Sequence, residues 1–414
     1  MKRIPNINFT IRHDICTGCG ICQGVCPSMA ISIYAVNGQF RPKIDDAKCN
    51  NSKGCHRCYD SCPGVGVNLV TLSQEYFDDN ETKADKYAGR YLKCFAACST
   101  DESIRLQCSS GGVVTQFLVW LLETNRIDGA VVTKYDNEAA LKVNTFIATT
   151  REEILSAKSS KYAPVSFYNV VQDIKSAKGS RYVIVGLPCH IHGFRKLEKI
   201  DKRFREKIFG YFSLFCSGNQ TFHYTEYILG QCHLDIDRIN YLAYREGEPS
   251  GMVARGNGIE FFKKYSDYNR PLKSTFYPRR CLLCVDFQGE LADVAFGDIM
   301  SKPEDTFGSG MNAVIVRSTK WLSLFEQATQ EGIINSSEIS LERLNYKRMM
   351  VKNKKIQNSL FVALLKKIGK TTPEYDINCD GRVNVKTFLK YCMKRFKQYV
   401  GCHKWLWFML PSIG

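Results

Sequence analysis

Two runs of closely spaced cysteines near the N-terminus constrain the fold more than any other feature of this sequence. The first run has cysteines at positions 16, 19, 22 and 26 and ends in Pro27, and the second has them at 49, 55, 58 and 62 and ends in Pro63. A C-x2-C-x2-C-x3-C-P run is the thiolate spacing of chains that hold two [4Fe-4S] clusters. The N-terminal segment is therefore predicted to be a compact module that transfers single electrons.

In this pattern the cysteine before proline ligates the cluster of the other run. One cluster is assigned to Cys16, Cys19, Cys22 and Cys62, and the other to Cys49, Cys55, Cys58 and Cys26. The second run departs from the usual spacing, because the five residues 50–54 separate its first two cysteines. We expect this loop to bulge and still bring Cys49 to its cluster.

Zinc binding and disulfide bonding are the alternative interpretations of these cysteines. Zinc takes four ligands per ion and does not explain why both runs end in Cys-Pro. Disulfide scaffolds belong to short secreted chains, whereas this sequence has 414 residues and begins without the apolar stretch of a secretory signal. The spacing favours iron–sulfur clusters, which need a reducing compartment, so we expect a cytoplasmic protein.

Charge is unevenly distributed along the chain. The net charge is +16, and residues 341–414 alone contain sixteen Lys or Arg and four Asp or Glu. No run reaches the ~18 apolar residues of a membrane-spanning helix. The basic C-terminal segment therefore suggests an anionic partner.

Four segments are predicted: a ferredoxin module at 1–77, a body in two parts at 87–165 and 166–335, and a basic tail at 336–414. Asn37-Gly38 between two strand-like runs predicts a hairpin, and the polar residues 78–86 predict a linker. In the body, strand patterns at 127–133, 143–149, 182–186, 209–216, 292–298 and 313–317 alternate with helical ones at 113–123, 151–157, 191–200 and 321–328. The fold class is α+β, with a mixed α/β body.

Ser109, Ser110, Gly111 and Gly112 stand immediately before the predicted helix at 113–123. Free N–H groups and the positive end of a helix favour phosphate at such a place, although the same residues also serve as an ordinary cap. The segment is thus a candidate anion site whose chemistry the local sequence leaves open.

Four further cysteines lie where they could meet: Cys189 and Cys216 at the ends of predicted strands, and Cys281 with Cys284 in a C-x2-C pair. Ends of parallel strands on one edge of a sheet converge. The four could hold a third cluster or a zinc ion, or remain unligated thiols, and spacing does not separate these alternatives. We interpret His190, beside Cys189, as a structural imidazole.

The tail combines apolar residues at helical spacing with lysines, and an aromatic run at 405–410 follows. One hypothesis is a helix on an anionic membrane surface, at the inner face of the membrane. The other is a helix packed against the body with a solvated basic face. No RNA-binding module is visible, so we expect no nucleic-acid partner. Residues 376–384 resemble a calcium loop, but Thr387 occupies the position of its bidentate acid, which favours a polar turn.

The body resembles the beta subunits of coenzyme F420 hydrogenase and dehydrogenase, here with a fused two-cluster ferredoxin domain. The resemblance spans about residues 90–320 and rests on short motifs in a fixed order: Arg105 with the segment 109–112, and then the segments 127–130, 158–162, 186–193, 215–216, 281–287 and 290–298. The basic tail has no counterpart in this pattern.

The resemblance implies a flavin, FAD, in the α/β body and favours a third [4Fe-4S] cluster on Cys189, Cys216, Cys281 and Cys284. The candidate flavin contacts that it implies are Ser110, Gly111, Gly112, Lys161 and Tyr162. It also implies transfer of electrons between clusters and flavin, and then to a two-electron carrier such as coenzyme F420 or another substrate.

We therefore expect an iron–sulfur flavoprotein oxidoreductase that couples single-electron transfer to a two-electron reaction. Its electron partner would be a redox protein or a small carrier. The substrate is not specified, and a precursor in polysaccharide biosynthesis is one hypothesis, since relatives beside polysaccharide genes share this body. The alternative is an electron-input module that serves a separate enzyme and has no substrate of its own. No catalytic residue is identified.

Overall fold

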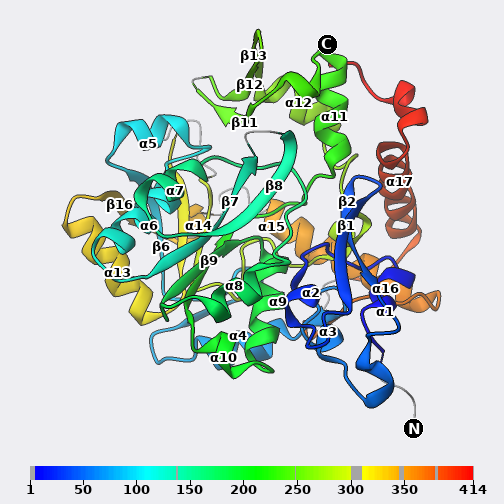
Figure 1. The fold of residues 1–414 in the computed structure, drawn as a ribbon, viewed down its shortest axis with the longest axis horizontal. Helices are drawn as coiled ribbons and strands as arrows, with labels where there is room; N and C mark the ends of the chain where they lie inside the picture. The colour runs from blue at the N-terminus through cyan, green and yellow to red at the C-terminus, as the bar shows by residue number, and fades with distance from the viewer. Residues whose placement is uncertain are drawn as a thin grey trace.

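A large mixed sheet with helices on both faces forms the centre of the molecule, and the N-terminal module packs against one of these faces (Figure 1). The computed structural model describes residues 5–136, 139–247, 249–299, 310–344, 349–377 and 381–413.

The central sheet has eight strands in the order β16-β6-β15-β14-β10-β9-β7-β8. Four of them, β7, β9, β10 and β14, run parallel. The remaining neighbours, β7–β8, β14–β15, β15–β6 and β6–β16, form antiparallel pairs. Their bounds are β6 (Lys93–Ser99), β7 (Gly129–Asp136), β8 (Ala139–Ala148), β9 (Tyr182–Gly186), β10 (Ile208–Leu214), β14 (Val294–Asp298), β15 (Asn312–Val316) and β16 (Ile334–Ile339). Strands from 87–165 and from 166–335 therefore share one sheet.

One face of the sheet is covered by α6 (Val113–Glu123) and α13 (Thr319–Gln330), with α5 (Glu102–Gln107) and α7 (Arg151–Ser156) beside α6. Aromatic side chains fill this core: the ring centroids of Phe117 and Phe212 are 5.6 Å apart, and Trp321 lies 4.9 Å from Phe212. The apolar run of 113–123 was expected to be a buried helix, and α6 confirms that prediction.

The opposite face carries α8 (Val170–Ser176), α9 (Pro188–Glu198) and α10 (Lys202–Arg205), and the N-terminal module packs on α8 and α9. Glycines permit the close approach: a Cβ at Gly24 would lie 2.7 Å from Val171 Cβ, and one at Gly193 would lie 2.5 Å from Ile21 Cδ1. The module and the body thus share a hydrophobic core.

The N-terminal module consists of α1 (Asn8–Arg12), α2 (Ile21–Val25), β1 (Ile31–Val36), β2 (Gln39–Ile44), η1 (Asn50–Lys53), α3 (Arg57–Asp60), β3 (Gly66–Val67) and α4 (Leu69–Tyr76). The predicted hairpin is confirmed, with Val36 opposite Gln39 and positive φ angles of 48° and 72° at Asn37 and Gly38.

Residues 78–86 are not a simple linker. Part of this segment forms β4 (Lys83–Asp85), which pairs with β5 (Gly89–Tyr91). Polar composition masked this short hairpin, because Ala84 and Tyr91 are the only apolar residues of its two strands. The expected linker is corrected accordingly.

A second, smaller sheet had no counterpart in the expected organisation. It contains β11 (Tyr241–Glu246), β12 (Gly251–Gly256) and β13 (Ile259–Lys264), with η2 (Ile236–Arg238) before it and α11 (Phe222–Gln231) and α12 (Tyr265–Leu272) packed nearby. Buried tyrosines, among them Tyr224, Tyr244 and Tyr268, form its core.

The C-terminal segment wraps back onto the N-terminal module and the body. It comprises α14 (Leu341–Leu344), α15 (Met349–Lys352), the π-turn η4 (Asn353–Gln357), α16 (Asn358–Lys367), β17 (Glu374–Tyr375), α17 (Val385–Cys402) and η5 (Lys404–Met409). Strand β17 pairs with β3 of the N-terminal module. Among the described residues, no helix combines the length and the apolar composition needed to cross a bilayer.

Candidate redox centre and adjoining cavity

The first predicted cysteine group is buried between the N-terminal module and α9. Burial raises the pKa of Cys19 to about 12, and the nearby thiolates of Cys62 and Cys16 add to the increase. Cys22 interacts in the same way with the other three. Backbone N–H groups of Gly18 and Gly64 donate to the sulfurs of Cys16 and Cys62, at 3.4 and 3.3 Å. Four buried cysteine sulfurs, two of which receive N–H bonds, need a compensating cation to be held together as thiolates, which fits a cluster.

The second group is closer to the surface. Burial raises the pKa of Cys58 to about 12, with Cys26 and Cys55 contributing, and Ala30 N donates to Cys26 Sγ at 3.3 Å. The extra residues between Cys49 and Cys55 form η1, which ends at Gly54 with a φ of 87°. Cys49 lies at the start of this turn, and its sulfur is 4.0 Å from Asn6 Nδ2.

The third set of cysteines does converge at the edge of the sheet. Cys189 lies in the first turn of α9, Cys216 follows β10, and Cys281 and Cys284 lie in and after η3 (Arg279–Leu283). Burial raises the pKa of Cys189, and the thiolates of Cys284, Cys216 and Cys281 raise it further. Cys189 also interacts with Cys19, so this set adjoins the first group of the N-terminal module.

No set of three or more His, Cys, Asp or Glu side chains in the described part of the chain is gathered as tightly as a single-ion site requires. The members of each group interact electrostatically with one another, and several of their sulfurs receive N–H donors. Asn219 N adds one more such donor, 3.5 Å from Cys281 Sγ.

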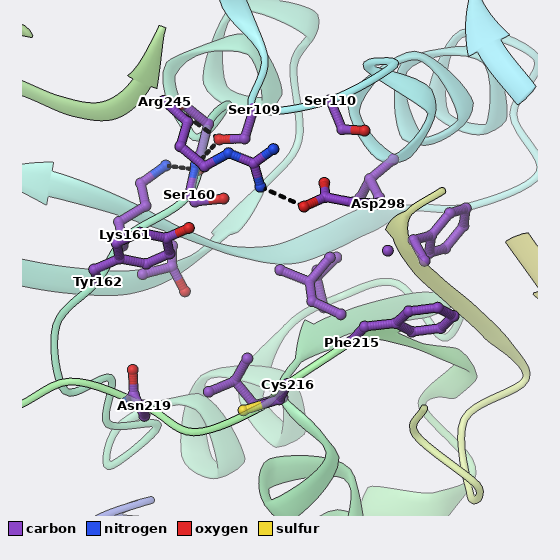
Figure 2. A pocket seen from close by; sticks show the side chains of 18 of the residues that line it. Ser109, Ser110, Ser160, Lys161, Tyr162, Phe215, Cys216, Asn219, Arg245 and Asp298 are labelled. Carbon is purple, nitrogen blue, oxygen red and sulfur yellow. Dashed lines mark hydrogen bonds and ion pairs between the residues drawn. The ribbon is translucent and has the colours of Figure 1, made fainter. Parts of the chain in front are cut away.

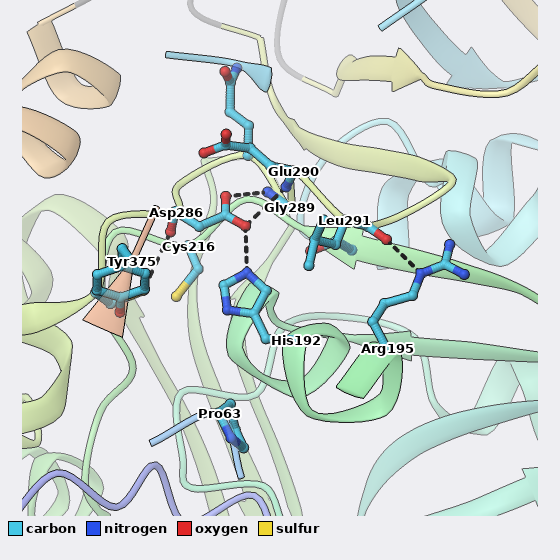
Figure 3. Close-up of polar contacts among 12 residues, drawn as sticks. Pro63, His192, Arg195, Cys216, Asp286, Gly289, Glu290, Leu291 and Tyr375 are labelled. Atoms are coloured by element: carbon cyan, nitrogen blue, oxygen red, sulfur yellow. Dashed lines mark hydrogen bonds and ion pairs between the residues drawn. The ribbon is translucent and has the colours of Figure 1, made fainter. Parts of the chain in front are cut away.

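A buried carboxylate organises the loop after Cys284. Asp286 accepts hydrogen bonds from Gly289 N at 2.8 Å, from Glu290 N at 2.9 Å and from His192 Nε2 at 2.8 Å (Figure 3). Burial raises its pKa, but the interactions with His192, the Glu290 N–H and the Lys354 ammonium together outweigh burial and lower the pKa to about 2. The carboxylate therefore stays ionised and fixes the loop against α9.

Residues far along the chain close over the third cysteine set. The buried ammonium of Lys354 donates to the carbonyl of Cys216, and Asn358 Nδ2 donates to the carbonyls of Cys281 and Cys284 at 3.1 and 2.7 Å. Burial lowers the pKa of Lys354, but the thiolates of Cys284, Cys216 and Cys281 outweigh it and raise the pKa above its ordinary value. Lys354 thus supplies a permanent positive charge beside these sulfurs.

Neither residue was predicted to belong to the site. Lys354, Asn358, Phe361 and Leu365 recur at helical spacing, and all four are buried. Polar residues on the apolar face of a helix are a signal of a buried polar contact, but the pattern does not identify its partner.

A cavity of about 520 Å³ adjoins the third cysteine set (Figure 2). Its wall includes the ends of β9, β10 and β14, the start of α6, and side chains of the smaller sheet and α12. Cys216 belongs both to this wall and to the cysteine set. Ligands of open α/β sheets bind at such carboxyl ends of parallel strands.

The chemistry of the cavity wall favours anions. Among the described residues, five basic side chains line it against the one carboxylate of Asp298, and these are Lys158, Lys161, Arg245, Arg270 and Lys273. Arg245 pairs with Asp298 at 2.7 Å. Arg245 Nε and Gln220 Oε1 are buried there without a hydrogen-bond partner among the described residues. The phosphates of FAD fit the start of α6 and the basic side chains, and its other polar groups fit the unpaired polar atoms.

Four of the five expected flavin contacts line the cavity. Gly112, with a φ of 74°, caps α6, and the hydroxyl of Ser110 donates to Met311 O at 2.7 Å. Tyr162 hydrogen bonds to Tyr265 at 3.1 Å. Gly111 does not line the cavity: its missing side chain allows contact with neighbouring strands, where a Cβ would lie 2.7 Å from Ala97 O.

Lys161 holds the loop that faces the start of α6. Its Nζ donates to the carbonyls of Ala157, Lys158 and Ser159 at 2.6, 2.6 and 3.0 Å, and Ser160 N donates to Ser109 Oγ at 2.8 Å. Burial lowers the pKa of Lys161 to about 7.

His190 is structural, as the sequence suggested, and also lines the cavity. Its Nδ1 accepts a hydrogen bond from Leu187 N at 3.1 Å, and burial lowers its pKa to about 3, so the imidazole is neutral near pH 7.

The calcium-like segment is only partly described, since Asn378 and Asp380 lie outside the described residues. Asp376 accepts hydrogen bonds from Val70 N and Thr71 N, at 3.0 and 2.8 Å, at the start of α4. Its carboxylate thus caps a helix of the N-terminal module.

Comparison with known proteins defines the family. The family model described as coenzyme F420 hydrogenase/dehydrogenase, beta subunit N-term, matches residues 94–172, and the model for the C terminus of the same subunit matches 179–342. A 4Fe-4S dicluster domain matches residues 15–67. This chain belongs to the coenzyme F420 hydrogenase/dehydrogenase beta subunit family. It carries a fused two-[4Fe-4S] domain, as the cysteine spacing predicted.

Two relatives illustrate the range of the family. A coenzyme F420-dependent sulfite reductase from Methanocaldococcus jannaschii is 27% identical over 358 residues, which cover 83% of this chain and 50% of that protein. The chain therefore spans about half the length of that relative. The coenzyme F420 hydrogenase subunit beta from Methanothermobacter thermautotrophicus is 27% identical, with 69% of this chain and 99% of the relative covered.

A chain of the F420-reducing [NiFe] hydrogenase complex from Methanosarcina barkeri shares the fold. It superimposes with a TM-score of 0.56 at 21% identity and covers 72% of this chain and 99% of its own length. The family match ends at residue 342, so Lys354, Asn358 and the helix α17 lie beyond it.

Proposed function

We propose that this family member is an iron–sulfur flavoprotein oxidoreductase in which electrons pass between the two-cluster domain and FAD in the cavity. In this proposal Cys189, Cys216, Cys281 and Cys284 hold a third [4Fe-4S] cluster between them. The observation that carries the proposal is the position of Cys216, which belongs to the cysteine set and to the cavity wall.

Burial and proximity suggest the order of the centres. Cys26, Cys49 and Cys55 are partly exposed, whereas Cys16, Cys19, Cys22 and Cys62 are buried. Cys58 interacts with Cys62, and Cys19 interacts with Cys189. This supports a path from a surface cluster on Cys26, Cys49, Cys55 and Cys58, through the buried cluster, to the third set and the cavity.

A flavin bound in the cavity would supply the exchange between one-electron and two-electron transfer. Ser110, Gly112 and Tyr162 would hold and orient it, while Arg245 and the start of α6 would receive its phosphates. Lys161 would keep the 157–160 loop in place. His190, neutral near pH 7, would close the wall on the side of Cys189.

The names of the relatives favour coenzyme F420 as the two-electron carrier. One relative is an F420-dependent sulfite reductase that continues well beyond the match, and others are named as hydrogenase subunits. A hydrogenase beta subunit implies other subunits. A second candidate function is therefore an electron-input module that serves a partner enzyme. A polysaccharide precursor as substrate receives no support from these names.

A reducing compartment, the cytoplasm, suits twelve cysteine thiolates that ligate iron.

The relay is tested with reduced coenzyme F420 as donor. Anaerobic protein reconstituted with iron, sulfide and FAD is mixed with the donor; absorbance reports flavin reduction and electron paramagnetic resonance reports the clusters. Wild-type protein should show reduction at both. Cys216→Ser should show reduced flavin while the two clusters of the N-terminal domain stay oxidised on the same timescale.

Cys232→Ser is the matched control, because Cys232 follows α11 and belongs to none of the three groups. It should behave as the wild type does. Equal reduction of the N-terminal clusters in Cys216→Ser and wild type would contradict the relay. Reduction by dithionite but not by reduced F420 would remove F420 as the carrier, and a requirement for a copurifying enzyme would favour the second function.

A further inference from the structure

The apolar face of helix α17 points away from the protein. Val385, Leu389, Met393 and Phe396 are exposed, with 61% of Leu389 and 55% of Phe396 accessible to solvent. Their spacing of three or four residues places them on one side of the helix. The helix lies at the periphery of the molecule, beside α16 (Figure 1).

The opposite side of α17 attaches the helix to the body through polar and small residues. Gln398 Nε2 donates to Pro278 O at 3.2 Å, Lys394 Nζ donates to Gln357 Oε1 at 3.1 Å, and Tyr391 packs on Phe361. A Cβ at Gly401 would lie 2.3 Å from Thr275 O, so the helix end is in backbone contact. A surface helix ordinarily buries its apolar face, and this one does the reverse.

The turn after α17 also exposes large apolar side chains. Trp405 and Phe408 in η5 are 69% and 80% exposed, and residues three apart share a face in a 3₁₀ turn. Trp407 points the other way and packs on His223, Tyr227 and Phe276. An anchored turn with outward aromatic rings suits the boundary between water and lipid.

The charge of this region is wholly positive. Residues 381–414 contain seven Lys or Arg and no Asp or Glu. Lys386, Lys390 and Lys397 are exposed along one edge of the apolar face and have no acidic partner among the described residues, whereas Lys404 pairs with Glu226 at 2.8 Å. An apolar face with lysines along its border matches an anionic lipid surface.

We propose that α17 and η5 dock this protein on an anionic membrane, with α17 lying in the plane of the headgroups. Leu389, Phe396, Trp405 and Phe408 enter the apolar boundary, while the lysines contact acidic lipid headgroups. Because the lipid-facing side is opposite the body-facing side, docking needs no rearrangement of the helix. This docking is independent of the proposed redox function, since no cysteine group takes part in it.

Sedimentation with vesicles tests the proposal on the full, cluster-loaded chain. Vesicles of phosphatidylglycerol and phosphatidylcholine should bind the wild type at low salt, and vesicles of phosphatidylcholine alone should bind it far less. Lys386→Glu, Lys390→Glu and Lys397→Glu together should lower partitioning on the order of a hundredfold, since each basic residue contributes to attraction by the anionic surface. Leu389→Gln with Phe396→Gln should lower it at least as much.

The control variant carries the same change of charge at three exposed positions of the body, as Lys178→Glu, Lys202→Glu and Lys264→Glu. It should bind anionic vesicles as the wild type does. Iron content and light scattering are measured on every variant. Absence of wild-type binding to anionic vesicles, or equal loss in the control, would overturn the proposal. A second result would also overturn it: wild-type protein that does not bind vesicles but forms dimers, when the variant with Leu389→Gln and Phe396→Gln is monomeric. The apolar face would then join two copies of the chain.

Discussion

The carbonyl oxygen of Cys216 accepts a hydrogen bond from Lys354, which lies 138 residues further along the chain and beyond the family match. This contact places a buried positive charge at the boundary between the third cysteine set and the cavity. The segment that contributes it, η4 and α16, also binds the carbonyls of Cys281 and Cys284 through Asn358. The C-terminal extension is thus part of the proposed redox centre.

Lys354→Met should lower the reduction potential of the third cluster. A nearby cation stabilises the reduced, more negative form, so its removal disfavours reduction. A redox titration followed by electron paramagnetic resonance measures the potential. Lys352→Met, two residues earlier and partly exposed near Tyr87, is the control and should change it far less. An unchanged potential in Lys354→Met would show that the ammonium has no electrostatic role.

Arg245→Gln should weaken FAD binding by roughly tenfold to a hundredfold, because hydrogen bonds to charged groups contribute more than neutral ones. Arg245 lines the cavity and has an unpaired Nε. Titration of flavin-free protein with FAD gives the dissociation constant. Arg255→Gln, on the adjacent strand and paired with Glu260 at 3.1 Å, should bind FAD as the wild type does. Equal affinities for all three proteins would place the phosphates elsewhere.

The stability contributed by Lys161 should depend on pH. Burial lowers its folded-state pKa to about 7, against an ordinary value of 10.5. Between these values the unfolded chain binds the extra proton, so wild-type stability rises with pH relative to Lys161→Met, by at most about 1.4 kcal/mol per pH unit. Urea unfolding of both proteins from pH 6 to 9 measures the difference. A difference that stays flat above pH 7 would mean that Lys161 keeps its proton.

Gly111→Ala should destabilise the protein by about 1–3 kcal/mol, because the new methyl group meets backbone on two sides. A Cβ there would lie 2.7 Å from Ala97 O and 2.9 Å from Asn312 N. Gly230→Ala is the control, since its Cβ would meet nothing within 4 Å and alanine suits the helix α11. Denaturant unfolding compares the two. Equal stability of Gly111→Ala and wild type would show that β6 and β15 can move apart.

Local spacing made much of this architecture predictable. Cysteine runs, the Asn37-Gly38 turn and the apolar run of α6 are signals within a few residues of one another, and each element was found. The convergence of Cys189 and Cys216 followed from a topological rule about strand ends, and the C-x2-C spacing added Cys281 and Cys284 as candidate partners. Only the preference for a cluster over zinc or free thiols came from the resemblance.

Long-range polar contacts were not predictable in the same way. Lys354 reaches Cys216, and Arg245 reaches Asp298, across 138 and 53 residues. No periodic pattern encodes such pairs, since they depend on how the smaller sheet and the C-terminal segment fold back on the body. The resemblance implied that Gly111 contacts the flavin, yet packing against β6 is what requires a glycine there.

The most direct test of the central claim is the content of iron, sulfide and flavin in one anaerobically purified sample. Three clusters and the cavity predict about twelve irons and one FAD per chain, with about four irons lost in Cys216→Ser. About eight irons without flavin would contradict the account, because the protein would then be a two-cluster ferredoxin fused to a body that carries no redox centre.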